Sequence, residues 1–175
     1  MIETKIKNTV RDVADFPKPG IVFKDITPIL KDAQLCNEIT LALVEQLKEI
    51  EIDVVAGIES RGFLFGMLLA QALKVPFVPI RKAGKLPFHT IQQHYTLEYD
   101  NAILELHKDA LSPGQKVLIH DDLLATGGTV IAASKLIAKL DAELAGCSFI
   151  IALDFLKGRD RIAEYTTQTY ALASY

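Results

Sequence analysis

The sequence predicts an α/β fold, a mainly parallel twisted sheet flanked by helices, in one domain spanning residues 1–175. Short apolar runs alternate along the chain with segments whose apolar residues recur at helical spacing, and this alternation favours a parallel sheet. The length of 175 residues and the 50% share of hydrophobic residues suit a single globular core. We therefore expect ligands to bind at the carboxyl ends of the strands.

The first thirty residues are predicted to form a cap segment, residues 1–30, at the margin of this sheet. Ile2, Ile6 and Val10 repeat at intervals close to those of a helix, until two prolines and a glycine in residues 16–20 impose an extended or turned course. Residues 21–26 are expected to form a short strand. Two interpretations stay open: the segment covers the edges of the core, or it forms a lip over a ligand site.

The remaining elements follow from apolar spacing. It predicts helices over residues 35–50, 66–70 and 130–140, strands over residues 53–58, 75–80, 117–119 and 147–155, and an edge strand over residues 169–172. Prolines in 75–80 indicate an irregular or edge position. Residues 81–99 show no helical stripe and begin with three cations, so we predict a flexible lid loop over an anion. A merely solvated loop is the alternative.

Composition excludes several classes of function. The net charge of −3 provides no general attraction to nucleic acid. No apolar span of membrane length is present, and the first ten residues contain no apolar signal core, so we expect a cytoplasmic protein without membrane contact. Cys36 and Cys147 stand far apart and are predicted to be free thiols, while the four histidines lack metal-binding spacing.

The segment VLIHDDLLATGGTV, residues 117–130, contains a strand, an acid pair and a glycine turn that opens a helix. It matches neither the phosphate-binding GxxxxGK[ST] loop nor the dinucleotide-binding GxGxxG turn. The remaining interpretation is a cradle for one phosphate, formed by backbone N–H groups and the hydroxyls of Thr126 and Thr129. The strand is expected to end where the acid pair begins.

Asp121 and Asp122 form this acid pair. They are either solvated turn residues or ligands of the vicinal hydroxyls of a ribose, held directly or through Mg²⁺. A diol-binding acid pair followed by a phosphate cradle describes a ribose 5-phosphate site. Arg61 follows another predicted strand and, unless it is an ordinary surface arginine, it is expected to neutralise a second anionic group. The cations that begin the lid loop, Arg81, Lys82 and Lys85, are expected to do the same.

VLIHDDLLATGGT closely resembles the phosphoribosyl diphosphate (PRPP) motif of type I phosphoribosyltransferases. The likeness extends along nearly the whole chain to the adenine phosphoribosyltransferase family, through FPKPGIVFKDITPIL, GIESRGFLFG, RKAGKLPF, YTLEYD, LELHKDAL and LKGR, in that order. The acid pair and glycine turn specify only the superfamily, whereas the first of these segments and the RKAGKLP–LEY loop point to adenine. The resemblance implies transfer of a phosphoribosyl group from PRPP to adenine, giving AMP and pyrophosphate in purine salvage.

The resemblance also implies a set of site residues. PRPP and AMP would be bound by Arg61, Arg81, Lys85, Asp121, Asp122, Ala125, Thr126, Gly127, Gly128 and Thr129. Adenine would lie against Val22, Phe23, Lys24, Phe155 and Leu156, and Glu98 would be the catalytic acid/base near the purine. Mg²⁺ would be held mainly by PRPP and pyrophosphate, with no protein ligand assigned, and the enzyme would be a homodimer.

Three residues depart from the family's usual pattern. His120 replaces the apolar residue that usually precedes the acid pair, Asp100 replaces a common glycine, and Lys24 replaces a frequent arginine. None of them touches the phosphate turn. Two other functions stay open: the same transfer to xanthine, hypoxanthine or orotate, and a ligand-sensing regulator that keeps the PRPP fold without catalysis.

Overall fold

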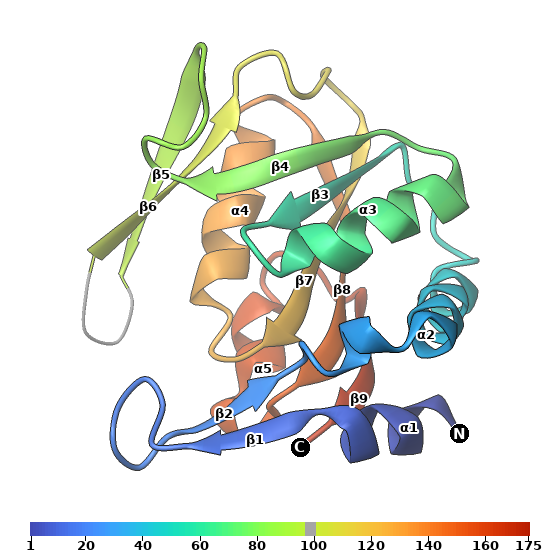
Figure 1. Cartoon of the computed structure of the whole chain (residues 1–175). Helices are drawn as coiled ribbons and strands as arrows, with labels where there is room; N and C mark the ends of the chain where they lie inside the picture. The colour runs from blue at the N-terminus through green and yellow to red at the C-terminus, as the bar shows by residue number, and fades with distance from the viewer. Residues whose placement is uncertain (97–100) are drawn as a thin grey trace.

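Seven strands form a twisted central sheet in the computed structural model, which describes residues 1–96 and 101–175 (Figure 1). Their order is β5-β6-β4-β3-β7-β8-β9. Five neighbouring strands run parallel: β4 (Phe77–Lys82), β3 (Val54–Ile58), β7 (Lys116–Leu124), β8 (Glu143–Ala152) and β9 (Thr169–Ser174). The antiparallel hairpin of β5 (Thr90–Thr96) and β6 (Asn101–His107) extends the sheet beyond β4. The predicted α/β fold is confirmed.

Helices cover both faces of the sheet. α2 (Ala33–Gln46) and α3 (Gly62–Leu73) pack on one face together with α1 (Ile2–Thr9), and α4 (Gly128–Ala138) packs on the other. Strand residues alternate between these layers, so Val117 and Ile119 face α4 while Leu118 faces α2 and α3. This alternation explains why the central strands are continuous apolar runs: both of their faces are buried.

The cap segment forms a small sheet of its own. β1 (Arg11–Ala14) and β2 (Val22–Asp25) pair antiparallel, and a short 3₁₀ turn, η1 (Ile29–Lys31), leads into α2. The prolines and glycine of residues 16–20 lie in the loop that joins the two strands. The end of β9 leads to the cap segment, where Lys24 on β2 and Lys7 on α1 lie 4.0 and 5.3 Å from the ring centroid of Tyr175.

The structure corrects two predictions about the elements near the acid pair and the lid. β7 does not end before the acid pair but continues through it to Leu124, because β8 pairs with it as far as Ala152. Residues 81–99 are not one irregular loop, since residues 90–96 form β5. Ile91 and Tyr95 lie on the same face of β5 and pack against the core, an alternating pattern that polar neighbours obscured.

Of the two predictions about edge strands, the one for residues 75–80 is wrong and the one for residues 169–172 is confirmed. β4 lies inside the sheet rather than at its edge, because the β5–β6 hairpin covers it. Pro79 is tolerated there since the antiparallel pairing with β6 begins only at Arg81. The predicted edge strand near the carboxyl terminus is confirmed as β9. In the described part of the chain, no helix combines the length and the apolar character needed to cross a membrane.

Candidate active site

The parallel strands bring the predicted anion-binding residues to one edge of the sheet. Arg61 follows β3, Arg81 lies near the end of β4, and the glycine turn follows β7. The end of β8 leads into η2 (Asp154–Leu156) and the short helix α5 (Gly158–Ile162) beside that turn. Because parallel strands share the direction of their carboxyl ends, residues far apart in the sequence form one site.

The glycine turn, Ala125–Thr129, has the backbone conformation of an anion cradle. Gly127 has φ of +81°, a left-handed conformation that suits glycine, and it provides no side chain to cap α4. Among the described residues no side chain caps the N-terminus of α4, where unpaired N–H groups and the helix dipole favour negative charge. Gly158 supports the turn from behind, because a Cβ there would lie 2.2 Å from the carbonyl oxygen of Ala125.

The two carboxylates of the acid pair differ in burial and in hydrogen-bond partners. Asp122 is only 2% exposed, and its Oδ2 accepts a hydrogen bond of 2.5 Å from Nε of Arg61. The interpretation of Asp122 as a solvated turn residue is therefore wrong. Asp121 is less enclosed, and its Oδ1 accepts from the backbone N–H of Asp122 at 2.9 Å. Burial and the neighbouring carboxylate raise the pKa of Asp121 well above its ordinary value.

Arg61 connects the acid pair to the cap segment. Its guanidinium carbon lies 4.8 Å from the ring centroid of Phe23 on β2, a cation–π distance. Phe23 in turn makes an edge-to-face contact with Phe16 at 5.2 Å. The arginine is therefore held by Asp122 through Nε and by an aromatic ring, and is not an ordinary surface arginine.

The basic residues that begin the predicted lid gather around Glu59, the first residue after β3. Its side chain is 5% exposed, and its carboxylate accepts hydrogen bonds from Nε of Arg81 at 2.9 Å and the N–H of Lys82 at 3.0 Å. Nζ of Lys85 lies 3.1 Å from its other oxygen. Burial alone would raise the pKa of Glu59, but these donors bring the pKa below its ordinary value. Glu59 was not predicted as a site residue, since nothing local marks a carboxylate whose partners lie over twenty residues away.

A cavity of about 810 Å³ lies between the cap segment and the strand ends. It joins the phosphate turn, through Ala125 and Thr126, to four of the predicted adenine-binding residues: Val22, Lys24, Phe155 and Leu156. Phe23 is not among its lining residues, because alternation along β2 directs that ring toward Arg61.

Tyr175 and Asp12 also line this cavity, and sequence reasoning did not find them. Nζ of Lys24 lies 2.7 Å from Oδ1 of Asp12 and 4.0 Å from the ring centroid of Tyr175. No local pattern marks Tyr175, since only the pairing of β9 with β8 brings the end of the chain to the site.

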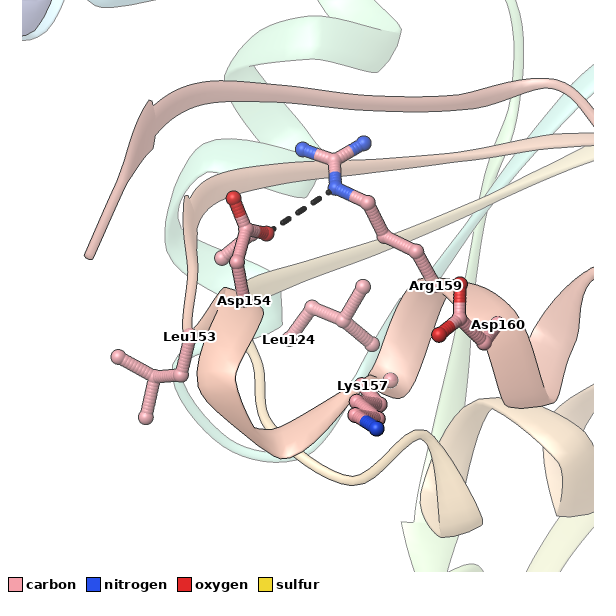
Figure 2. Close-up of a pocket in the computed structure, with 8 residues that line it drawn as sticks. Leu124, Leu153, Asp154, Lys157, Arg159 and Asp160 are labelled. Atoms are coloured by element: carbon pink, nitrogen blue, oxygen red, sulfur yellow. Dashed lines mark hydrogen bonds and ion pairs between the residues drawn. The ribbon is translucent and has the colours of Figure 1, made fainter.

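A smaller cavity, of about 210 Å³, lies between the ends of β7 and β8, the turn η2 and the start of α5 (Figure 2). Asp154 and Arg159 face each other across it, with Nε of Arg159 3.3 Å from Oδ1 of Asp154. Nη1 of Arg159 also donates to the carbonyl of Thr169 on β9 at 3.0 Å. These contacts hold the turn between β8 and α5, which carries Phe155 and Leu156 into the larger cavity.

Glu98 and Asp100 lie outside the described residues, so the predicted catalytic acid/base has no structural description. Tyr95, three residues before Glu98, is half-buried on β5. Burial raises its pKa, and a hydrogen bond with Thr129 opposes that shift. Nζ of Lys139 donates to the carbonyl of Gln92 at 2.6 Å, so β5 contacts both ends of α4. The strand that leads to Glu98 therefore lies against the phosphate turn.

His120 is fully buried directly before the acid pair. Its Nδ1 lies 2.7 Å from Oγ of Ser148, and its Nε2 has no hydrogen-bond partner within the described residues. Burial lowers the pKa of His120 to about 3. The side chain therefore replaces an apolar residue as a neutral imidazole and adds no charge to the site.

This arrangement defines the class of protein. The architecture of a phosphoribosyltransferase is a parallel sheet that carries a monophosphate turn, an adjacent acid pair and a cluster of cations for a second anion. A family model described as "Phosphoribosyl transferase domain" matches residues 23–169. The chain belongs to the adenine phosphoribosyltransferase family.

Sequence relatives and solved structures agree on the family. The adenine phosphoribosyltransferase of Cytophaga hutchinsonii is 51% identical over 175 residues, 100% of this chain and 97% of the relative. That of Flavobacterium johnsoniae is 53% identical over 161 residues, which cover 92% of this chain and 95% of the relative. The crystal structure of the Thermoanaerobacter pseudethanolicus enzyme superposes with a TM-score of 0.96 at 46% identity, covering 100% of both chains. The Giardia lamblia enzyme, solved with 9-deazaadenine, gives 0.95 at 33% identity, covering 100% of this chain and 98% of that one.

Proposed function

We propose that the chain transfers the phosphoribosyl group of PRPP to adenine, giving AMP and pyrophosphate in purine salvage. The observation that carries the proposal is the meeting of the phosphate turn, the acid pair and the basic cluster at one edge of the sheet, where the phosphate turn also lines the cavity under the cap segment. Relatives about 50% identical along the whole chain are named for this activity.

In this proposal each part of the site binds one part of PRPP. The N–H groups of Ala125–Thr129, with the hydroxyls of Thr126 and Thr129, bind the 5′-phosphate. Asp121 and Asp122 hold the ribose hydroxyls. Arg61, Arg81 and Lys85 bind the pyrophosphate, a role supported by their meeting at one edge of the sheet.

The chemistry requires charge stabilisation more than a nucleophile. Displacement at the anomeric carbon passes through an oxocarbenium-like state, so negative charge grows on the leaving pyrophosphate. Cations fixed before the reaction stabilise that charge without reorganising. Adenine binds beside Val22, Lys24, Phe155 and Leu156, in the cavity lined by the cap segment. Closure of the basic lid over the site would exclude water that could otherwise hydrolyse the sugar phosphate.

Mg²⁺ belongs to the proposal as a partner of PRPP. The proposal, which rests on the family resemblance, is that the ion is held mainly by oxygens of PRPP and pyrophosphate. Asp121, beside the proposed ribose site, offers the carboxylate oxygens that Mg²⁺ prefers. When bound, the ion supplies positive charge to the pyrophosphate.

The proposal is tested by assaying the full chain with PRPP and adenine, hypoxanthine, xanthine or orotate, with Mg²⁺ or with excess chelator. We expect AMP and pyrophosphate from adenine, and a loss of turnover on chelation that added Mg²⁺ restores. Faster turnover of another base would overturn the choice of acceptor. Binding of PRPP without turnover of any base would identify a ligand-sensing regulator.

Glu98 is proposed as the acid/base near the purine, on the basis of the family resemblance. Replacing it by glutamine should lower kcat by roughly 10²–10⁴-fold, the usual contribution of a positioned acid/base, and leave PRPP affinity within about two-fold. Steady-state kinetics and calorimetry measure the two quantities, with Glu51→Gln on the distant surface as the control. Equal losses of turnover and affinity would remove Glu98 from this role.

A homodimer and a cytoplasmic location complete the proposal. Leu41 on α2 and Met67 on α3 are 58% and 55% exposed, and Leu30 and Leu68 line one groove beside α2 and α3. Exposed apolar side chains of this kind support an interface. Sedimentation equilibrium should give twice the monomer mass of 19.3 kDa, and a monomer at micromolar concentration would contradict the dimer. The two unpaired cysteines suit a reducing compartment, and cell fractionation tests the location.

A further inference from the structure

A buried carboxylate on β6 holds the backbone of the basic loop that follows β4. Glu105 is 2% exposed, and its Oε1 accepts hydrogen bonds from the N–H groups of Lys85 at 3.0 Å and Leu86 at 2.9 Å. Burial alone would raise the pKa of Glu105, but the N–H groups of Leu86, Gly84 and Lys85 bring the pKa below its usual range. The loop therefore wraps around a charged carboxylate.

This contact fixes the position of the Lys85 backbone, from which the side chain extends. Nη1 of Arg81 donates to the carbonyl of Lys85 at 3.0 Å, and Nζ of Lys85 lies 3.1 Å from Glu59. The N–H, carbonyl and ammonium groups of Lys85 are thus each held by a different partner. The Lys85 side chain is nevertheless 52% exposed, so the ion pair with Glu59 does not bury it away from a ligand at the strand ends.

A buried carboxylate is a costly way to hold a loop. Removing its charge from water carries a large desolvation penalty, which neutral acceptors would avoid, and several converging N–H donors are needed to offset it. The resulting loop has little conformational freedom, because charge-assisted hydrogen bonds are shorter and stronger than neutral ones. Preset geometry of this kind matters most where a cation must meet an anion without reorganising.

We propose that Glu105 is a positioning residue for the pyrophosphate end of the site, acting through the backbone of residues 84–86 to place the ammonium group of Lys85. The inference rests on the proposed function, which assigns Lys85 to pyrophosphate. Glu105 touches no substrate. Its replacement should therefore weaken PRPP binding and leave the chemical step largely intact.

The test is a double-mutant cycle on the full chain, with KM for PRPP and kcat measured at saturating adenine. Glu105→Gln keeps the side-chain size but removes the charge and presents an amide to the loop. Lys85→Met keeps the aliphatic stem without the ammonium group. We expect each single variant to raise KM by about ten-fold and to change kcat by less than about three-fold. In the Lys85→Met background, Glu105→Gln should change KM by less than about two-fold.

Controls separate positioning from folding. Glu51→Gln breaks a surface ion pair with Lys116 and should leave KM unchanged. If Glu105→Gln unfolds, Glu105→Asp keeps the charge on a shorter stem, and its smaller rise in KM should likewise vanish with Lys85→Met. If the increases in KM caused by the Glu105 and Lys85 substitutions multiply in the double variant, Glu105 does not act through Lys85, and only the positioning role is overturned. If Lys85→Met leaves KM unchanged, both the assignment of Lys85 to pyrophosphate and the inference are overturned.

Discussion

PRPP affinity should fall by about 10²–10⁴-fold when Asp121 and Asp122 are both replaced by asparagine. Hydrogen bonds to charged groups contribute about 1.5–3 kcal/mol each, and the proposal assigns one ribose contact to each carboxylate. Asparagine keeps the side-chain shape, so the loss reports charge rather than packing. Isothermal titration calorimetry with PRPP and Mg²⁺ measures the change.

The single variants should differ, because the two carboxylates have different neighbours. Asp122→Asn also removes the charged partner of Arg61, so both the ribose and the pyrophosphate ends of the site should be affected. Asp121→Asn removes a carboxylate whose pKa is raised by burial and by Asp122, and leaves the arginine contact in place. Asp109→Asn, an exposed aspartate away from the site, is the control. Unchanged affinity in the double variant would refute the assignment of the acid pair to the ribose hydroxyls.

His120 should make the protein markedly less stable in acid. The pKa of His120 is lowered from 6.5 to about 3 by burial, so the folded state keeps a neutral imidazole while the unfolded chain binds a proton below pH 6.5. Stability contributed by this difference is fully present above pH 6.5 and is lost as the pH falls toward 3. Linkage gives a loss of about 1.4 kcal/mol per pH unit, reaching on the order of 4 kcal/mol near pH 3.

Urea unfolding at pH 7.5, 5.5 and 4.5 measures this effect as a difference between variants. His120→Leu combined with Ser148→Ala removes the imidazole without leaving the Ser148 hydroxyl unpaired, so its free energy of unfolding should decline less steeply with falling pH. Ser148→Ala alone keeps the buried histidine and should keep the steep decline. Parallel pH profiles for the double variant and the natural sequence would show that His120 does not control acid stability.

The acid pair and the glycine turn were predictable because their chemistry lies in one contiguous segment. A buried apolar run, two carboxylates and small residues opening a helix each carry a local signature. The structure places the carboxylates in the last part of β7 and the small residues at the start of α4. The helices and the inner strands were predictable for a similar reason, since burial of one helical face imposes a period and burial of both faces of a strand produces a continuous apolar run.

Prediction failed where a residue's environment depends on distant partners. The polar residues of β5 show no clear strand pattern, and only pairing with β6 and packing on α4 make the segment a strand. β7 passes through its acid pair because β8 continues beside it, which no feature of residues 117–124 reveals. Glu59 and Glu105 look like ordinary surface acids in the sequence, yet both are buried beneath the basic loop.

The sequence by itself determined the family, the α/β fold and the phosphate turn with its acid pair. Only the tertiary structure decided how the charges combine: Arg61 binds Asp122 and stacks on Phe23, and Arg81 and Lys85 converge on Glu59. The physical reason is the parallel sheet, which aligns the carboxyl ends of strands that are separated by whole helices in the chain. Charges interact over a few ångströms of space, whatever their separation in sequence.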